Sequence, residues 1–81
     1  MASDEKFIQK IRNNPKDVRF EDACRAAELI GFVRHNAKSA HTVFKRVDEI
    51  EILNFQKHGS KLKPYQARQL IVMLDKYWQS K

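Results

Sequence analysis

The stretch that decides the fold lies near the end of the chain and reads PYQARQLIVMLDKYW over residues 64–78. Proline suits the first turn of a helix, because the N–H that it lacks would have no partner there. Apolar residues follow at the helical positions i, i+3, i+4, i+7, i+10 and i+11, namely Ala67, Leu70, Ile71, Leu74, Tyr77 and Trp78. This spacing predicts an amphipathic helix with a broad apolar face. Such a face has to be buried against another layer of the protein.

The preceding third of the chain supplies that layer. Short apolar runs separated by polar turns predict three strands, at Phe32–Asn36, residues 40–46 and Glu51–Phe55. Because the links between them are short, the strands should form an antiparallel meander. In the middle strand His41, Val43 and Lys45 should point to one face and Thr42, Phe44 and Arg46 to the other. Pattern alone does not indicate which of the two faces is buried.

Two further helices are expected before the strands. Residues 3–13 carry a narrow apolar stripe, and residues 20–30 carry a second one that includes Cys24. Gly31 follows where a left-handed residue commonly ends a helix. We interpret residues 1–81 as a single α+β domain, with residues 3–13 as an N-terminal helical extension and 20–78 as the core. In that domain helices pack on a three-stranded antiparallel sheet.

The net charge of +6 is distributed unevenly. Residues 1–30 contain six Lys/Arg and six Asp/Glu, whereas residues 31–69 contain eight Lys/Arg and only three Asp/Glu. Clustered Lys and Arg are typical of a surface that binds phosphates, so a polyanion is one expected partner. A basic surface that is simply solvated is the other interpretation.

The composition also argues against several classes of protein. Cys24 is the only cysteine, so no internal disulfide and no cysteine metal cluster is expected. No apolar run approaches the roughly 20 residues that cross a bilayer, and no signal peptide is evident at the start. We therefore predict a cytoplasmic protein with no membrane partner.

His41 is the best candidate for catalysis. Histidine can act as a general base or acid near neutral pH, and RNA carries its own nucleophile, the 2′-hydroxyl. Cations are needed to stabilise charge that develops on phosphorus, and Lys38, Lys45 and Lys61 could provide them. His58 is a possible second proton carrier. Such a mechanism requires neither a metal nor another cofactor.

Each of these residues also has an ordinary structural explanation. A strand histidine is more often structural or solvated, which is our interpretation of His35, and His58 is expected in a turn. The acidic group Asp48-Glu49-Glu51 could bind a metal, but carboxylates beside a strand turn are usually solvated. Lys61 and Lys63 precede a helix start, where free N–H groups attract phosphate, although a basic loop without a ligand is also possible.

Several motifs occur together in a recognisable order. A helix beginning near Val18-Arg19-Phe20-Glu21-Asp22-Ala23-Cys24-Arg25 ends at Leu29-Ile30-Gly31-Phe32. The histidine strand Ser39-Ala40-His41-Thr42-Val43-Phe44 follows, and then Lys57-His58-Gly59-Ser60-Lys61-Leu62-Lys63-Pro64-Tyr65-Gln66. From about Phe20 to Tyr77 the chain resembles the HicA toxin family, the mRNA interferases of HicAB toxin–antitoxin systems. At the histidine strand, Ser39-Ala40 stands where the family has Gly-Ser, and Thr42 where a second histidine is frequent.

The resemblance implies a double-stranded-RNA-binding-domain-like fold, helix–three strands–helix, here with an extra N-terminal helix. It implies a metal-independent endoribonuclease acting on mRNA, and a HicB-like antitoxin as protein partner. The family's catalytic histidine corresponds to His41. The RNA backbone would then be held by basic residues at five positions, which are Lys38, Lys45, Lys57, Lys61 and Lys63.

Two other functions fit the same sequence. The fold could grip duplex RNA by its shape and phosphates without cutting it. The protein could also be an inactive relative that is kept for partner binding or regulation.

Overall fold

The computed structural model describes residues 2–38 and 41–78. In this part of the chain three helices accompany one open, four-stranded antiparallel sheet, which confirms the α+β class. The elements in chain order are α1 (Ala2–Asn13), α2 (Phe20–Leu29), β1 (Val33–Lys38), β2 (His41–Lys45), β3 (Leu53–His58), β4 (Lys61–Leu62) and α3 (Pro64–Tyr77). Each of the three expected helices is present within one or two residues of its predicted bounds.

The sheet differs from the prediction in its third and fourth strands. The strand expected at Glu51–Phe55 runs instead from Leu53 to His58. Before β3 the chain bends at Glu51, whose backbone N–H donates to the Glu49 carboxylate at 3.0 Å. Ile52, which the apolar pattern placed in the strand, is 46 % exposed. The prediction of three strands is wrong, because β4 adds a fourth beside β3.

The two edges of the sheet differ in whether another segment of the chain pairs with them. Beside β4 lies the segment before α2, where Leu62 N–H donates to the Val18 carbonyl at 2.8 Å and Phe20 N–H to that of Ser60 at 3.0 Å. At the other edge, β1 pairs with β2 in a register that shifts between His35 and Lys38, as in a β-bulge. Among the strands described, β1 therefore provides the uncovered edge.

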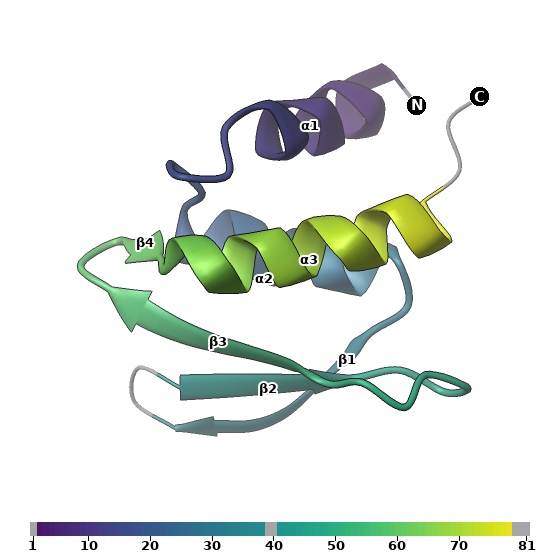
Figure 1. The fold of residues 1–81 in the computed structure, drawn as a ribbon. Helices are drawn as coiled ribbons and strands as arrows, with labels where there is room; N and C mark the ends of the chain where they lie inside the picture. Colours follow the sequence, from purple (N-terminus) through teal and green to yellow (C-terminus); the bar gives the residue numbers. More distant parts are fainter. Residues whose placement is uncertain (1, 39–40, 79–81) are drawn as a thin grey trace.

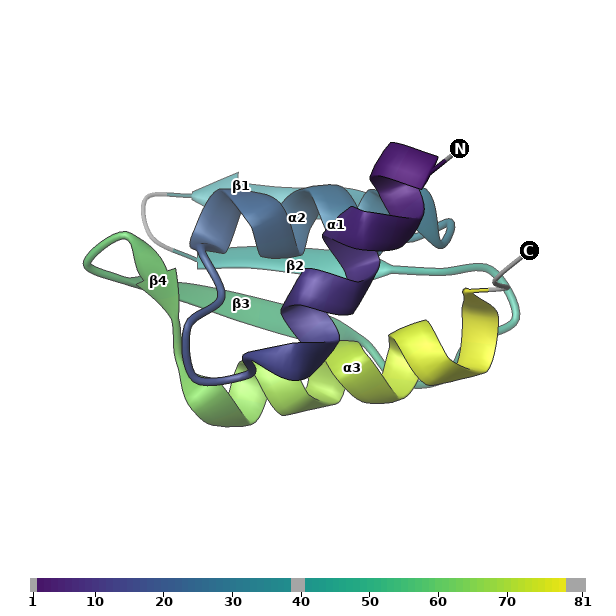
Figure 2. The same ribbon diagram turned by 90° about the horizontal axis from the view of Figure 1, so that it is seen from above.

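The elements form three layers (Figures 1 and 2). Helices α2 and α3 cover one face of the sheet, and α1 crosses over those two helices on their far side. The core lies between the sheet and the two helices, where Phe44, Phe55, Leu70 and Leu74 are completely buried. No described element covers the opposite face of the sheet (Figure 1).

The N-terminal helix α1 is fixed to the helix layer by apolar and polar contacts. Ile8 and Ile11 are buried in the same core cluster as the residues of the other helices. Arg12 forms an ion pair with Asp75 of α3 at 2.9 Å, and the indole N–H of Trp78 donates to Glu5 at 3.2 Å. Because α1 occupies the outer side of α2 and α3, it restricts access to those helices from that side.

Gly31 ends the turn after α2 in the left-handed region that the sequence predicted, with φ of +91°. The side chain of Arg46 lies directly beside this glycine. Its Nε donates to the Ile30 carbonyl at 2.8 Å, and its guanidinium carbon lies 3.8 Å from the centre of the Tyr77 ring. Arg46 thus joins the end of α2, the end of β2 and the end of α3.

Glu49 fastens the loop between β2 and β3 to the C-terminal end of α3. Its carboxylate accepts hydrogen bonds from Lys76 Nζ at 2.8 Å and from the Tyr77 hydroxyl. These bonds, with the one from the Glu51 backbone, lower the pKa of Glu49 to about 2. The side chain is 4 % exposed, so the expectation that this carboxylate is solvated is wrong.

Candidate nucleic-acid interface

The four strands have an unusual charge composition. They contain no Asp or Glu, although the whole chain has ten acidic residues. The same strands hold all three histidines and five Lys/Arg, which are Arg34 and Lys38 in β1, Lys45 in β2, Lys57 in β3 and Lys61 in β4. The sheet is therefore a locally cationic layer, and a polyanion would approach it without repulsion from strand carboxylates.

His41 lies on the open face of this sheet. It begins β2 and is exposed, whereas its neighbour Thr42 is 3 % exposed and faces the helices. Lys45 is exposed on the same face as His41, as the alternation in the sequence predicted. In the antiparallel register Gln56 of β3 is opposite His41, and His35 of β1 is opposite Val43. Two histidines and one lysine thus occupy a single uncovered surface.

Lys57 does not share that face. Alternation along β3 puts it on the helix side with Leu53 and Phe55, and its Nζ lies 5.9 Å from the centre of the Phe20 ring. There it helps to line a surface hollow of about 290 Å³ beside α2, together with Arg34. Lys57 and His41 are therefore separated by the sheet.

His58 ends β3 and is exposed, so the expectation that it lies in a turn is wrong. The turn begins at the next residue, Gly59, with φ of +67°. His58 pairs with Lys61 of β4, and it lies two residues beyond Gln56, the partner of His41. Because residues two apart on a strand share a face, His58 projects toward the same side of β3 as Gln56.

The two lysines before α3 have different surroundings. Lys61 Nζ forms an ion pair with Asp17 at 2.6 Å, and this hydrogen bond and charge lower the pKa of Asp17. Lys63 is the N-cap residue of α3, and its side chain makes no capping hydrogen bond. No acidic residue occupies the first turn of α3, so the positive end of the helix dipole there is not neutralised from within the helix.

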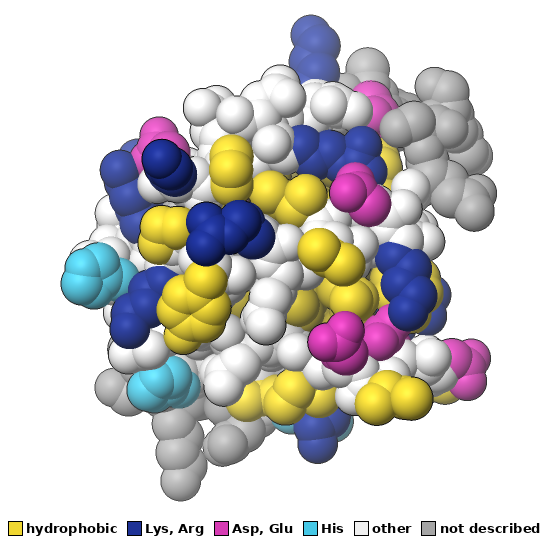
Figure 3. All heavy atoms as spheres, in the orientation of Figure 1, with side chains coloured by type: hydrophobic (Ala, Val, Ile, Leu, Met, Phe, Trp, Pro, Cys, Tyr) yellow, Lys and Arg dark blue, Asp and Glu magenta, His cyan; other side chains and the backbone are white. Residues whose placement is uncertain are grey.

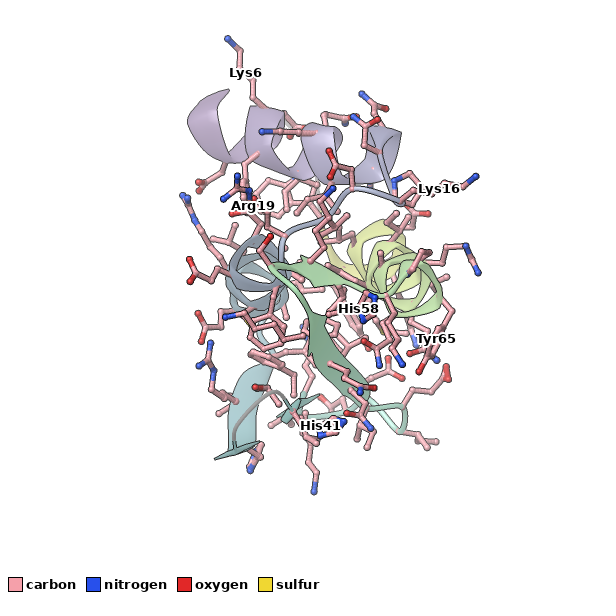
Figure 4. All side chains as sticks on the ribbon, turned by 90° about the vertical axis from the view of Figure 1, so that its left-hand side faces the viewer. Lys6, Lys16, Arg19, His41, His58 and Tyr65 are labelled. Carbon is pink, nitrogen blue, oxygen red and sulfur yellow. The ribbon has the colours of Figure 1, made fainter. Side chains whose placement is uncertain are left out.

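His41, His58 and the two lysines before α3 lie at one end of the sheet, whereas Lys45 lies at the other end of β2. In Figure 3 histidine side chains lie at the left beside several lysine and arginine side chains, basic side chains also occur at the top, right and bottom, and acidic side chains are most frequent at the lower right. Figure 4 views that left-hand side: His58 lies beside the end of β3, Tyr65 lies to its right, His41 lies below both, and Arg19 and Lys16 lie above them. The side chain of Lys38, and residues Ser39 and Ala40 of the histidine motif, lie outside what the structure describes.

Sequence reasoning missed one buried polar side chain at this end, that of Gln66. Its Oε1 accepts a hydrogen bond from the backbone N–H of Gln56 at 2.8 Å, and its Nε2 donates to the Tyr65 hydroxyl at 3.3 Å. The sequence does contain a signal, since Gln66 lies at helical spacing from the buried residues Leu70 and Met73. Gln66 thus provides a hydrogen-bond acceptor for Gln56 of β3, a residue that the two-residue strand β4 does not pair with.

Other candidates from the sequence belong to the core. Cys24 is buried, as expected, and burial raises the pKa of its thiol. Tyr77 and Trp78, which the apolar spacing placed on the buried face of the last helix, are partly buried against the core cluster. Among the residues that the structure describes, no group of three or more His, Cys, Asp or Glu could hold a metal ion.

Comparison of the chain with protein-family models, curated proteins and solved structures found no match. Within residues 2–38 and 41–78, no helix is long and apolar enough to cross a membrane. The function must therefore be inferred from the site itself.

Proposed function

We propose that this protein binds RNA and cleaves it without a metal, with His41 as the proton carrier. One observation carries the proposal: an exposed histidine lies on the open face of a sheet whose strands contain basic residues and histidines but no carboxylates. A phosphodiester backbone can approach such a face closely. A histidine there can exchange protons with the substrate at neutral pH.

The chemistry uses a nucleophile that belongs to the substrate. The 2′-oxygen attacks the adjacent phosphorus and loses its proton to a base, while the bond from phosphorus to the 5′-oxygen breaks and that oxygen gains a proton. The products are a 2′,3′-cyclic phosphate and a 5′-hydroxyl, so atoms and charge balance. His41 would perform one of the two proton transfers, which typically contributes about 10²–10⁴-fold to the rate.

Basic residues would hold the RNA on two sides of His41. Lys45 shares the open face, and His58, Lys61 and Lys63 line the path past the end of β3. Because each phosphate contact releases counterions, affinity should fall steeply as salt rises. This arrangement is compatible with the double-stranded-RNA-binding-domain-like fold and the HicA-like toxin that the motif order suggests, with mRNA as substrate and a HicB-like antitoxin as inhibitor.

The decisive experiment compares two histidines on the same face. Purified wild type, His41→Ala and His35→Ala are incubated with labelled RNA, with and without EDTA. We expect cleavage by wild type and by His35→Ala in both conditions, and none by His41→Ala. Binding of a 2′-O-methylated RNA should persist in His41→Ala. Cleavage by His41→Ala at the wild-type rate would refute the assignment, and loss of cleavage in EDTA would point to a metal.

The second candidate function is RNA binding without cleavage. It is favoured by one observation, that the His41 side chain has no hydrogen-bond or ion-pair partner among the described residues to orient its ring. Catalytic histidines are usually oriented by such a partner. In the same assay, RNA that stays intact under every condition but binds with a salt-dependent Kd would establish this alternative.

A further inference from the structure

Gln66 links the strand opposite His41 to an exposed tyrosine. Its side chain is 4 % exposed, and Thr42 is the other buried polar residue in the described part of the chain. The amide group joins two partners, with the Gln56 backbone N–H on one side and the Tyr65 hydroxyl on the other. A buried amide with both ends engaged holds both partners in fixed positions.

The direction of each hydrogen bond follows from the chemistry of the groups. A backbone N–H can only donate, so the atom of Gln66 that faces Gln56 must be the carbonyl oxygen. The NH₂ group therefore faces Tyr65 and donates to the phenol oxygen. With its oxygen serving as acceptor, the hydroxyl of Tyr65 has its own proton available for a group outside the protein.

The network lies close to His41. Gln56 is the register partner of His41, and paired Cα atoms in antiparallel strands are about 4.5–5.5 Å apart. From Gln56, two hydrogen bonds of 2.8 and 3.3 Å and one amide group lead to the Tyr65 hydroxyl. Figure 4 shows Tyr65, His58 and His41 on the same side of the molecule. Tyr65 is 51 % exposed, so a ligand can reach it.

We propose that Tyr65 is a second substrate-contact residue, which donates its hydroxyl proton to a phosphate oxygen of the RNA held at His41. Gln66 is the positioning residue that fixes this hydroxyl relative to β3. The proposal rests on the proposed RNA-binding function. A phosphate oxygen suits the position because the Tyr65 hydroxyl proton is free to donate to it, and the first turn of α3 contains no carboxylate that would repel it.

The test measures binding of a labelled 2′-O-methylated RNA, which cannot be cut, to Tyr65→Phe, Gln66→Met and the double variant. Loss of a hydrogen bond to a charged oxygen should weaken binding by about 10-fold in Tyr65→Phe. Gln66→Met should also weaken binding of this RNA. The double variant should be little weaker than Tyr65→Phe, since both changes disrupt one contact. Tyr77→Phe is the matched control in the same helix and should bind like wild type.

The outcomes separate the two proposals. If wild type binds RNA and Tyr65→Phe binds equally well, the hydroxyl contact is refuted while the proposed function stands. If Tyr65→Phe binds RNA as well as wild type but Tyr65→Ala binds weakly, the contact of Tyr65 with RNA would be stacking of a base on its ring and not the proposed hydrogen bond. Strictly multiplicative effects in the double variant would refute the positioning role of Gln66. Absence of binding by wild type would overturn the proposed function and this inference with it.

Discussion

Replacing Gly31 by alanine should destabilise the fold through two separable effects. The first is backbone strain, since φ of +91° is a conformation that costs an L-residue about 1–2 kcal/mol. The second is steric, because the new Cβ would lie 3.1 Å from Nε of Arg46. Arg46 would then have to shift by a few tenths of an ångström, which strains its contacts with the Ile30 carbonyl and the Tyr77 ring.

The shift weakens that hydrogen bond from a charged donor, whose complete loss would cost about 1.5 kcal/mol or more. Together the two effects predict that Gly31→Ala lowers the free energy of unfolding by about 2–3 kcal/mol. For a domain of this size the melting temperature should fall by roughly 8 °C or more. Thermal and urea unfolding followed by circular dichroism would measure both quantities.

Gly59 provides the matched control. It also has a positive φ, +67°, but a Cβ added there would meet nothing within 4 Å. Gly59→Ala should therefore show only the backbone strain, about 1–2 kcal/mol. In an Arg46→Ala background the cost of Gly31→Ala should fall to that same level. Equal destabilisation by Gly31→Ala and Gly59→Ala in the wild-type background would refute the steric reasoning.

Three further predictions concern other contacts. Gln66→Met leaves the Gln56 N–H without its acceptor and should cost about 1–3 kcal/mol in urea unfolding, whereas the exposed control Gln69→Met should stay within about 0.5 kcal/mol of wild type. Because the pKa of Glu49 is lowered from 4.5 to about 2, its stabilising effect is complete above about pH 4.5 and is lost as the pH falls toward 2. Melting temperatures measured between pH 2 and 7 should therefore decline less steeply below pH 4.5 in Glu49→Gln than in wild type, and identical slopes would contradict this. Phe55→Ala removes a completely buried ring and should cost about 3–5 kcal/mol, which a loss below 1 kcal/mol would contradict.

Helices were predictable because their signals are local. The apolar spacing of residues 64–78 predicts α3, and Gly31 marks the end of the second helix correctly. The alternation in β2 also predicts the shared face of His41 and Lys45, since side-chain direction in a strand depends only on sequence position.

The third and fourth strands were not predictable in the same way. The predicted third strand included Ile52, yet Ile52 is 46 % exposed and its neighbour Ile50 is 97 % exposed, because Glu49 holds the chain through contacts with residues 27 and 28 positions away. β4 has only two residues and depends on Val18, which lies more than forty positions earlier in the chain. Long-range bonds of this kind leave no periodic pattern in the local sequence.

The candidate site, like the fold, was predictable only in part. His41, Lys45 and the basic segment before α3 are visible as residue types in the sequence, but the separation of Lys57 from His41 by the sheet depends on the β2–β3 register. The role of Gln66 depends on the packing of α3 against β3. The sequence therefore predicts which kinds of side chain are present at the site better than it predicts how they are arranged in space.

The uncovered strand β1 also bears on how copies of this protein meet one another. An edge strand with unpaired N–H and C=O groups can template the strand of a second molecule, and such pairing leads to aggregation. Here the register shift between His35 and Lys38 interrupts the regular ladder, and basic residues line the strand. Like charges on two such edges would oppose their pairing, and the interrupted ladder would limit its length. The basic composition that suits the open face to the proposed polyanion thus also disfavours self-association through the edge of the sheet.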